Sequence, residues 1–87
     1  MLLESIKKRY LLIKGKDAEK EKIDEIILEF IGVLGYAEAS PMIVGSEKGK
    51  VILAVNVKSL NKIRASFALS EKQLNIIKVS GTLKGLK

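Results

Sequence analysis

The stretch that decides the fold is residues 23–35, IDEIILEFIGVLG. Its apolar residues recur at i, i+3, i+4, i+7, i+8 and i+11, which is the spacing of one buried stripe on an α-helix. The stripe consists of Ile23, Ile26, Ile27, Phe30, Ile31 and Leu34. Gly35 follows it as a typical helix stop, and Asp17 precedes it as an N-cap. The sequence therefore predicts a helix between Asp17 and Gly35 with one face in the core.

Extended segments lie on both sides of this helix. A turn at residues 45–49 joins two of them. Ser59 can cap a second, shorter helix, in which Leu60, Ile63 and Phe67 point inward. The predicted elements are a strand at 7–14, a helix at 17–34, strands at 37–44 and 50–57, a helix at 59–70 and a strand at 74–79.

The order β-α-β-β-α-β predicts a ferredoxin-like sandwich, an α+β fold in which both helices cover one face of a four-stranded antiparallel sheet. It fits a single domain over residues 1–87. Strand alternation predicts that the other face carries Tyr10, Leu12, Ile52, Ala54 and Ile76. A solvated sheet face normally alternates more cleanly than this. The half-apolar face therefore favours a protein partner, although small domains often carry some outward apolar residues.

The residue types that the chain lacks narrow its chemistry. It has no Cys and no His, which removes Cys/His metal sites, the Ser–His and Cys–His nucleophile pairs, and the usual general base near neutral pH. The lack of disulfides suits a reducing compartment. The longest apolar stretch, residues 30–37, is far below the roughly 20 residues of a membrane span. We therefore expect a cytoplasmic protein without a membrane partner.

The net charge of +6 is unevenly distributed. Residues 1–16 carry five bases and one acid, and residues 58–87 carry seven bases and one acid. Residues 17–30 carry six acids and two bases. If the two basic ends meet in the fold, they form the positive surface expected of a polyanion-binding protein. The alternative is a Lys-rich solubilising surface of the kind found in heat-adapted proteins.

Two enzyme-like interpretations fit poorly. The acids of the first helix suggest a carboxylate or metal site, but Lys20 and Lys22 are interleaved with them, which favours a solvated helix face. An acylphosphatase with this fold plan needs an Arg in the phosphate-binding loop after the first strand. Here that loop, residues 14–17, reads KGKD.

The sequence also bears on how RNA would be bound. RNA-recognition domains stack bases on aromatic residues of the central strands, but the strand at 50–57 has none and only Tyr10 is suitably placed. The binding mode that is left is recognition of the backbone and shape of folded RNA. The segment at 79–87, VSGTLKGLK, suits it, because Gly81 permits a close approach and the neighbouring hydroxyls and lysines can meet phosphates. An ordinary C-terminal turn explains the same residues.

Four segments, in the same order, resemble ribonuclease P protein component 2 of the archaeal and eukaryotic type. They are residues 8–10 (KRY), 34–41 (LGYAEASP), 58–69 (KSLNKIRASFAL) and 79–84 (VSGTLK). The last is the most specific, because a Val-Ser-Gly-Thr-Ile/Leu run at this place is characteristic of the family. The resemblance covers nearly the whole chain, and the ordered set carries it.

The resemblance implies a non-catalytic RNA-binding subunit of ribonuclease P, the ribonucleoprotein hydrolase that removes the 5′ leader from precursor tRNA in tRNA processing. In that complex the RNA subunit is the catalyst and holds the Mg²⁺, so no cofactor, metal site or catalytic residue is assigned to this chain. The implied partners are the ribonuclease P RNA, protein component 3 and, indirectly, precursor tRNA. A homodimer of this chain within a two-plus-two assembly is also implied.

The residues expected to contact RNA are basic or small and lie mostly toward the two ends of the chain. They are Lys7, Lys8, Arg9, Lys14, Lys58, Lys62, Arg64, Ser80, Gly81, Thr82, Lys84 and Lys87. Two alternatives stay open: another accessory protein that binds structured RNA, and a metabolite-sensing or dimerisation module of the same fold. RNA binding would weaken steeply with salt, whereas a sensing module would be stabilised by its ligand.

Overall fold

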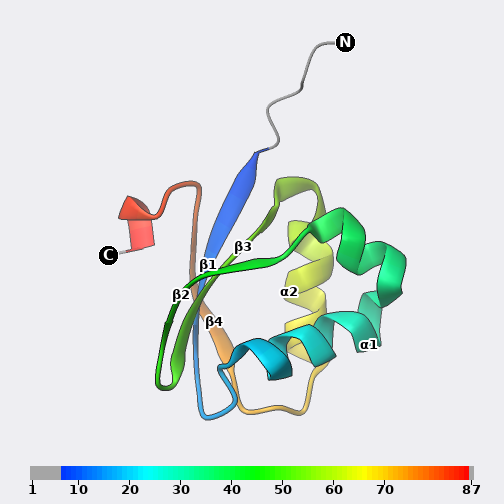
Figure 1. The fold of residues 1–87 in the computed structure, drawn as a ribbon, viewed down its shortest axis with the longest axis horizontal. Helices are drawn as coiled ribbons and strands as arrows, with labels where there is room; N and C mark the ends of the chain where they lie inside the picture. The colour runs from blue at the N-terminus through cyan, green and yellow to red at the C-terminus, as the bar shows by residue number, and fades with distance from the viewer. Residues whose placement is uncertain (1–6, 87) are drawn as a thin grey trace.

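The computed structural model describes residues 7–86 (Figure 1). Its elements are β1 (Lys8–Lys14), α1 (Lys20–Ala39), β2 (Met42–Glu47), β3 (Lys50–Asn56), the 3-10 turn η1 (Val57–Ser59), α2 (Leu60–Leu69), β4 (Asn75–Ser80) and the 3-10 turn η2 (Lys84–Leu86). The four strands form one antiparallel sheet in the order β2-β3-β1-β4. Both helices lie on one side of it (Figure 1). The predicted ferredoxin-like α+β fold is confirmed.

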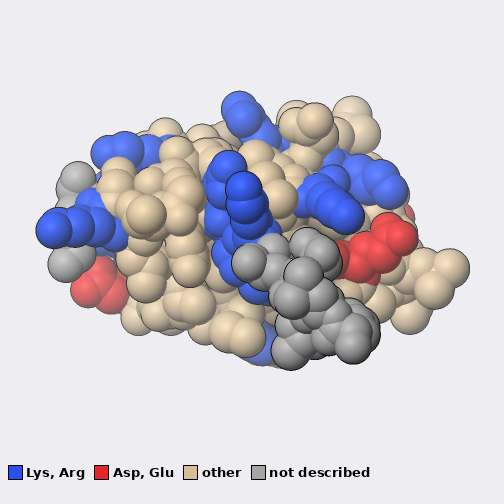
Figure 2. All heavy atoms as spheres, turned by 90° about the horizontal axis from the view of Figure 1, so that it is seen from above, with Lys and Arg blue, Asp and Glu red and all other residues tan. Residues whose placement is uncertain are grey.

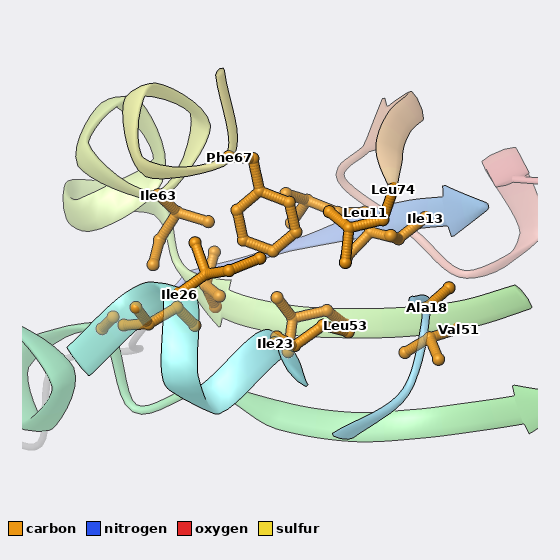
Figure 3. Close-up of a cluster of buried hydrophobic side chains, with 13 residues drawn as sticks. Leu11, Ile13, Ala18, Ile23, Ile26, Val51, Leu53, Ile63, Phe67 and Leu74 are labelled. Atoms are coloured by element: carbon orange, nitrogen blue, oxygen red, sulfur yellow. The ribbon is translucent and has the colours of Figure 1, made fainter. Parts of the chain in front are cut away.

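The core fills the space between the sheet and the two helices (Figure 3). Its large fully buried aliphatic side chains are Leu11 and Ile13 of β1, Val51, Leu53 and Val55 of β3, Ile23, Ile26 and Ile27 of α1, and Ile63 of α2. Burying one such side chain stabilises the fold by roughly 1.5–3 kcal/mol. The predicted alternation of β3 and the inward positions of Ile63 and Phe67 are confirmed.

Helix α1 breaks at Gly32, whose φ of 73° and ψ of −177° are not helical. The chain then resumes the helix and ends it beyond Gly35, where Ser40 (φ 46°) donates its N–H to the carbonyl of Tyr36 at 2.9 Å. The predicted stop at Gly35 is therefore wrong. The predicted stripe is also wrong at two positions: Phe30, before the break, is 37% exposed, and the break turns Leu34 away from the core and leaves it 82% exposed.

A hydrogen bond joins the two halves of α1 across this break. The Tyr36 hydroxyl donates to Asp24 Oδ1 at 2.9 Å, and Lys20 Nζ donates to Asp24 Oδ2 at 2.8 Å. Burial raises the pKa of Tyr36 above its usual value, and the hydrogen bond to Asp24 adds to the effect. The second half of α1 is thus held in place by a polar contact as well as by its buried Ala39.

Two predicted boundaries near α1 are wrong. Residues 37–39 are helical, so β2 begins only at Met42, directly after Pro41, and runs along one edge of the sheet. Asp17 does not cap α1, whose N-cap position is Glu19. Instead the Asp17 carboxylate accepts the Gln73 N–H at 2.8 Å, and the Asp17 N–H donates to the Gln73 carbonyl at 2.9 Å. These bonds tie the β1–α1 loop to the α2–β4 loop.

A bulge in β4 changes which of its side chains face the core. Leu12 of β1 pairs with Lys78, but the next residue, Ile13, pairs with Ile76. Ile77 is the extra residue between them and is 56% exposed. Ile76 therefore packs against the core, and its predicted position on the opposite sheet face is wrong.

No helix within residues 7–86 is both long enough and apolar enough to cross a membrane.

Candidate nucleic-acid interface

Two segments that are far apart in the sequence meet at the upper end of the sheet in Figure 1. Tyr10 of β1 pairs with Ser80 of β4. Beyond this pair, a methyl group placed on Gly81 would lie 3.6 Å from Arg9 Nη1, which is ordinary van der Waals distance. The Arg9 guanidinium therefore lies beside the Gly81 backbone, and Arg9 Nη1 also donates to the Lys8 carbonyl at 3.1 Å.

The residues after β4 fold into a compact turn held by hydroxyl groups. The Thr82 N–H donates to Ser80 Oγ at 3.1 Å, and the Gly85 N–H donates to Thr82 Oγ1 at 3.0 Å. A Cβ on Gly85 would collide with Ser80 Oγ, so a larger residue there would force the turn or the Ser80 side chain to shift. Because the Thr82 N–H is bonded within the turn, the hydroxyl protons of Ser80 and Thr82 are the donors available to a phosphate.

Three of the expected lysines lie at the same end of the sheet as Arg9. The Val57 N–H donates to the Lys7 carbonyl at 2.9 Å, which places the start of β1 beside η1 and its Lys58. Lys8 pairs with Asn56, the last residue of β3. The ends of β1, β3 and β4 thus bring Lys7, Lys8 and Lys58 near Arg9, and we call this region, with Ser80, Gly81 and Thr82, the Arg9 end.

Figure 2 views the molecule from above, which is the side of the Arg9 end. Lys and Arg side chains recur across the width of this face, and acidic side chains are visible toward its left and right sides. The acid that the described contacts identify near this end is Glu38, whose Oε1 lies 3.8 Å from Lys62 Nζ. Both of these side chains are exposed, so the pair is weak and leaves the face positive.

Other expected RNA contacts lie elsewhere. Lys14 is at the opposite end of β1, where it pairs with Lys50 and Asn75. Arg64 lines a pocket between α2 and β4 together with Phe67 and Ile76. Lys84 lies in the exposed part of η2, and Lys87 lies outside the described residues.

Lys78 is a basic residue that the sequence reasoning did not assign to the interface. It pairs with Leu12, and Leu12 points away from the helices because its neighbours Leu11 and Ile13 are in the core. Lys78 is therefore on the sheet face opposite the helices. Alternation with Val79, which packs against the core, already predicts this orientation of Lys78, and the bulge at Ile77 changes only the facing of Ile76.

The C-terminal turn covers part of that sheet face (Figure 1). η2 contacts β1 and β4, and Leu86 is only 7% exposed. Leu12 and Ala54 are 8% and 4% exposed although they point away from the helices. Leu12 and Ala54 thus lie on the sheet face where they were predicted, and Tyr10 and Ile52 are half-buried there. The sequence pattern did not predict that the C-terminal turn packs on the sheet through Leu86.

Within residues 7–86, no group of three or more Asp or Glu side chains is arranged to hold a metal ion. The first-helix acids are instead spread along α1, where Asp24 bonds to Lys20 and Tyr36, and Glu25 Oε1 lies 3.2 Å from Lys72 Nζ. Neither a protein-family model nor a curated protein matches this chain.

Proposed function

We propose that this protein binds structured RNA through the Arg9 end of its sheet. The observation that carries the proposal is the contact between Arg9 and the Gly81 backbone, beside the Tyr10–Ser80 pair. It joins the basic N-terminal segment to the hydroxyl- and lysine-rich C-terminal segment in one surface. Lysines, an arginine fork and hydroxyl donors on one convex end suit phosphate contacts.

The proposed binding mode is recognition of backbone and shape rather than base stacking. β3 has no aromatic residue, and the chain's own C-terminal turn contacts β1 and β4 on that side of the sheet (Figure 1). Single-stranded RNA that stacks its bases across a sheet needs that face free. A folded RNA can instead present phosphates to the end of the sheet, where Lys7, Lys8, Arg9 and Lys58 lie.

In its specific form, the proposal is that the chain is a non-catalytic subunit of ribonuclease P in the cytoplasm. The support is the sequence resemblance, two of whose four segments, residues 8–10 and 79–84, are the ones that meet at the Arg9 end. The chain would act with the ribonuclease P RNA and protein component 3 in removing the 5′ leader from precursor tRNA. Mg²⁺ would be held by the RNA, and contact with precursor tRNA would be indirect.

Reconstitution tests the specific form. The chain is added to its cognate ribonuclease P RNA and component 3, and cleavage of precursor tRNA is followed at limiting Mg²⁺. A rate gain over RNA plus component 3 is expected, and it should fall in a Lys8→Glu variant but not in Lys48→Glu, which makes the same change in the exposed turn between β2 and β3. No gain, together with salt-sensitive binding to other folded RNAs, would point to a different RNA-binding accessory protein.

A further inference from the structure

Four of the nine large apolar side chains that are exposed among the described residues lie around the break in α1. Leu28, Phe30, Val33 and Leu34 are all exposed, and Val33 and Leu34 reach 76% and 82%. Single exposed aliphatic residues are common in soluble proteins. Four large ones within seven residues, with the neighbours Val33 and Leu34 the most exposed, are of the kind that marks a protein interaction site. We call these four residues, together with Glu29 between them, the α1 surface.

The backbone is built to hold this surface outward. A regular helix would continue the stripe of Ile23, Ile26 and Ile27 and bury Leu34, but the positive φ at Gly32 turns the next residues away. The Tyr36–Asp24 hydrogen bond and the cap at Ser40 then fix the second half of the helix. The exposure of Val33 and Leu34 is therefore a property of an ordered segment.

The charge around the α1 surface is opposite to that of the Arg9 end. Residues 23–47 contain no Lys or Arg, although the chain carries 16 of them. Glu29 is exposed and forms no ion pair with a described residue. Lys62 and Lys72 form ion pairs with α1, Lys62 with Glu38 and Lys72 with Glu25. The exposed side chains along residues 28–38 are therefore apolar or acidic.

This combination of shape and charge selects one kind of partner. RNA and anionic membranes are repelled by acids. A second copy docked on the same surface would bring together two patches that both lack basic residues, because a two-fold interface uses the same patch of each subunit. We propose that the α1 surface binds a partner protein through an apolar stripe flanked by Lys or Arg, as a basic amphipathic helix presents. In Figure 1 the bend of α1 is on the right and the Arg9 end at the top, so both can be occupied together.

The test uses two helical peptides of about 18 residues, or five turns, with the same Leu stripe and either Lys or Glu on its flanks. Binding of each fluorescent peptide to the full chain is followed by anisotropy near physiological salt. We expect saturable binding of the Leu/Lys peptide, weakened roughly tenfold or more by Leu34→Ser. Ile77→Ser is the matched control, since Ile77 is also exposed but lies on β4, and it should leave binding unchanged.

Three results would overturn the proposal: equal binding of the Leu/Glu peptide, equal weakening by Leu34→Ser and Ile77→Ser, or no saturable binding. Sedimentation of the chain alone gives a fourth. A dimer that Leu34→Ser dissociates would show that the α1 surface binds a second copy of the chain. RNA affinity separates this inference from the proposed function, on which it does not depend. Leu34→Ser should leave RNA affinity and melting temperature unchanged, and a loss of RNA binding would assign the surface to the RNA interface instead.

Discussion

The guanidinium of Arg9 lies beside the backbone of Gly81, within van der Waals distance of any methyl group placed there. This relationship joins the first and last strands at the Arg9 end and aligns the basic residues of β1 with the hydroxyl-rich turn after β4. It also limits the size of the side chain that position 81 can hold without displacing Arg9. The proposed RNA binding should therefore depend on the packing at position 81.

Substitutions at Gly81 test this coupling. Gly81→Ala should leave RNA affinity and stability nearly unchanged, because its methyl group reaches only ordinary contact distance. Gly81→Leu should displace the guanidinium and weaken RNA binding about tenfold, the cost of roughly one charge-assisted hydrogen bond. Filter binding with the folded RNA gives the affinity, and thermal unfolding shows that the fold is intact. If Gly81→Leu binds RNA as the parent does, Arg9 does not need its position beside Gly81.

Gly85 holds the C-terminal turn over the sheet. Gly85→Ala should destabilise the protein by about 1–3 kcal/mol, because the new Cβ would collide with Ser80 Oγ and force the turn to shift. The shift should also expose Leu86 and raise binding of a hydrophobic dye. Urea unfolding measures the loss, with Gly81→Ala as the control for adding a methyl group to the same turn. An unchanged unfolding midpoint would mean that the turn adds nothing to stability.

Gly32 of α1 should resist substitution for reasons of backbone conformation alone. Nothing lies within 4 Å of a Cβ placed there, so the side chain itself has room. The positive φ with an extended ψ is, however, nearly restricted to glycine, and another residue costs of order 1–3 kcal/mol. Gly32→Ala should lower the free energy of unfolding by that amount. A D-alanine at the same position, introduced by chemical ligation, should not.

The Tyr36–Asp24 hydrogen bond predicts a pH dependence. Because the folded state raises the pKa of Tyr36, the unfolded chain ionises first, at about pH 10. The stability from this group is therefore complete below pH 10 and falls as pH rises through the folded-state pKa. Tyr36→Phe should cost about 1 kcal/mol at neutral pH through the lost hydrogen bond. It should also remove part of the loss above pH 10 that urea unfolding shows for the parent chain. Identical alkaline profiles would exclude this role.

The sequence predicted the features that follow from local periodicity. Alternation in β3 identified its inward residues, and helical spacing identified Ile23, Ile26 and Ile27. The break at Gly32 was missed because the apolar spacing continues past it to Leu34, and Gly35 looked like the better stop. Periodicity records which residues are apolar, but it does not record a change of backbone direction between them.

Other features depended on contacts that no local pattern encodes. Ile76 and Ile77 are equally apolar, so only pairing with β1 shows which one is the bulge residue. The burial of Leu86 depends on a sheet face assembled from distant strands. The expectation that the two basic ends could meet rested on charge alone, and the pairing of β1 with β4 supplies the Arg9–Gly81 contact.

The most direct test of the central claim is the affinity of the chain for its folded RNA as a function of salt, for the parent, Arg9→Gln and Lys48→Gln. RNA bound at the Arg9 end predicts a steep fall of affinity with salt. Arg9→Gln should reduce the slope of log affinity against log salt by about one, and Lys48→Gln should leave it unchanged. Equal slopes for all three proteins, or affinity that does not depend on salt, would contradict RNA binding at this end.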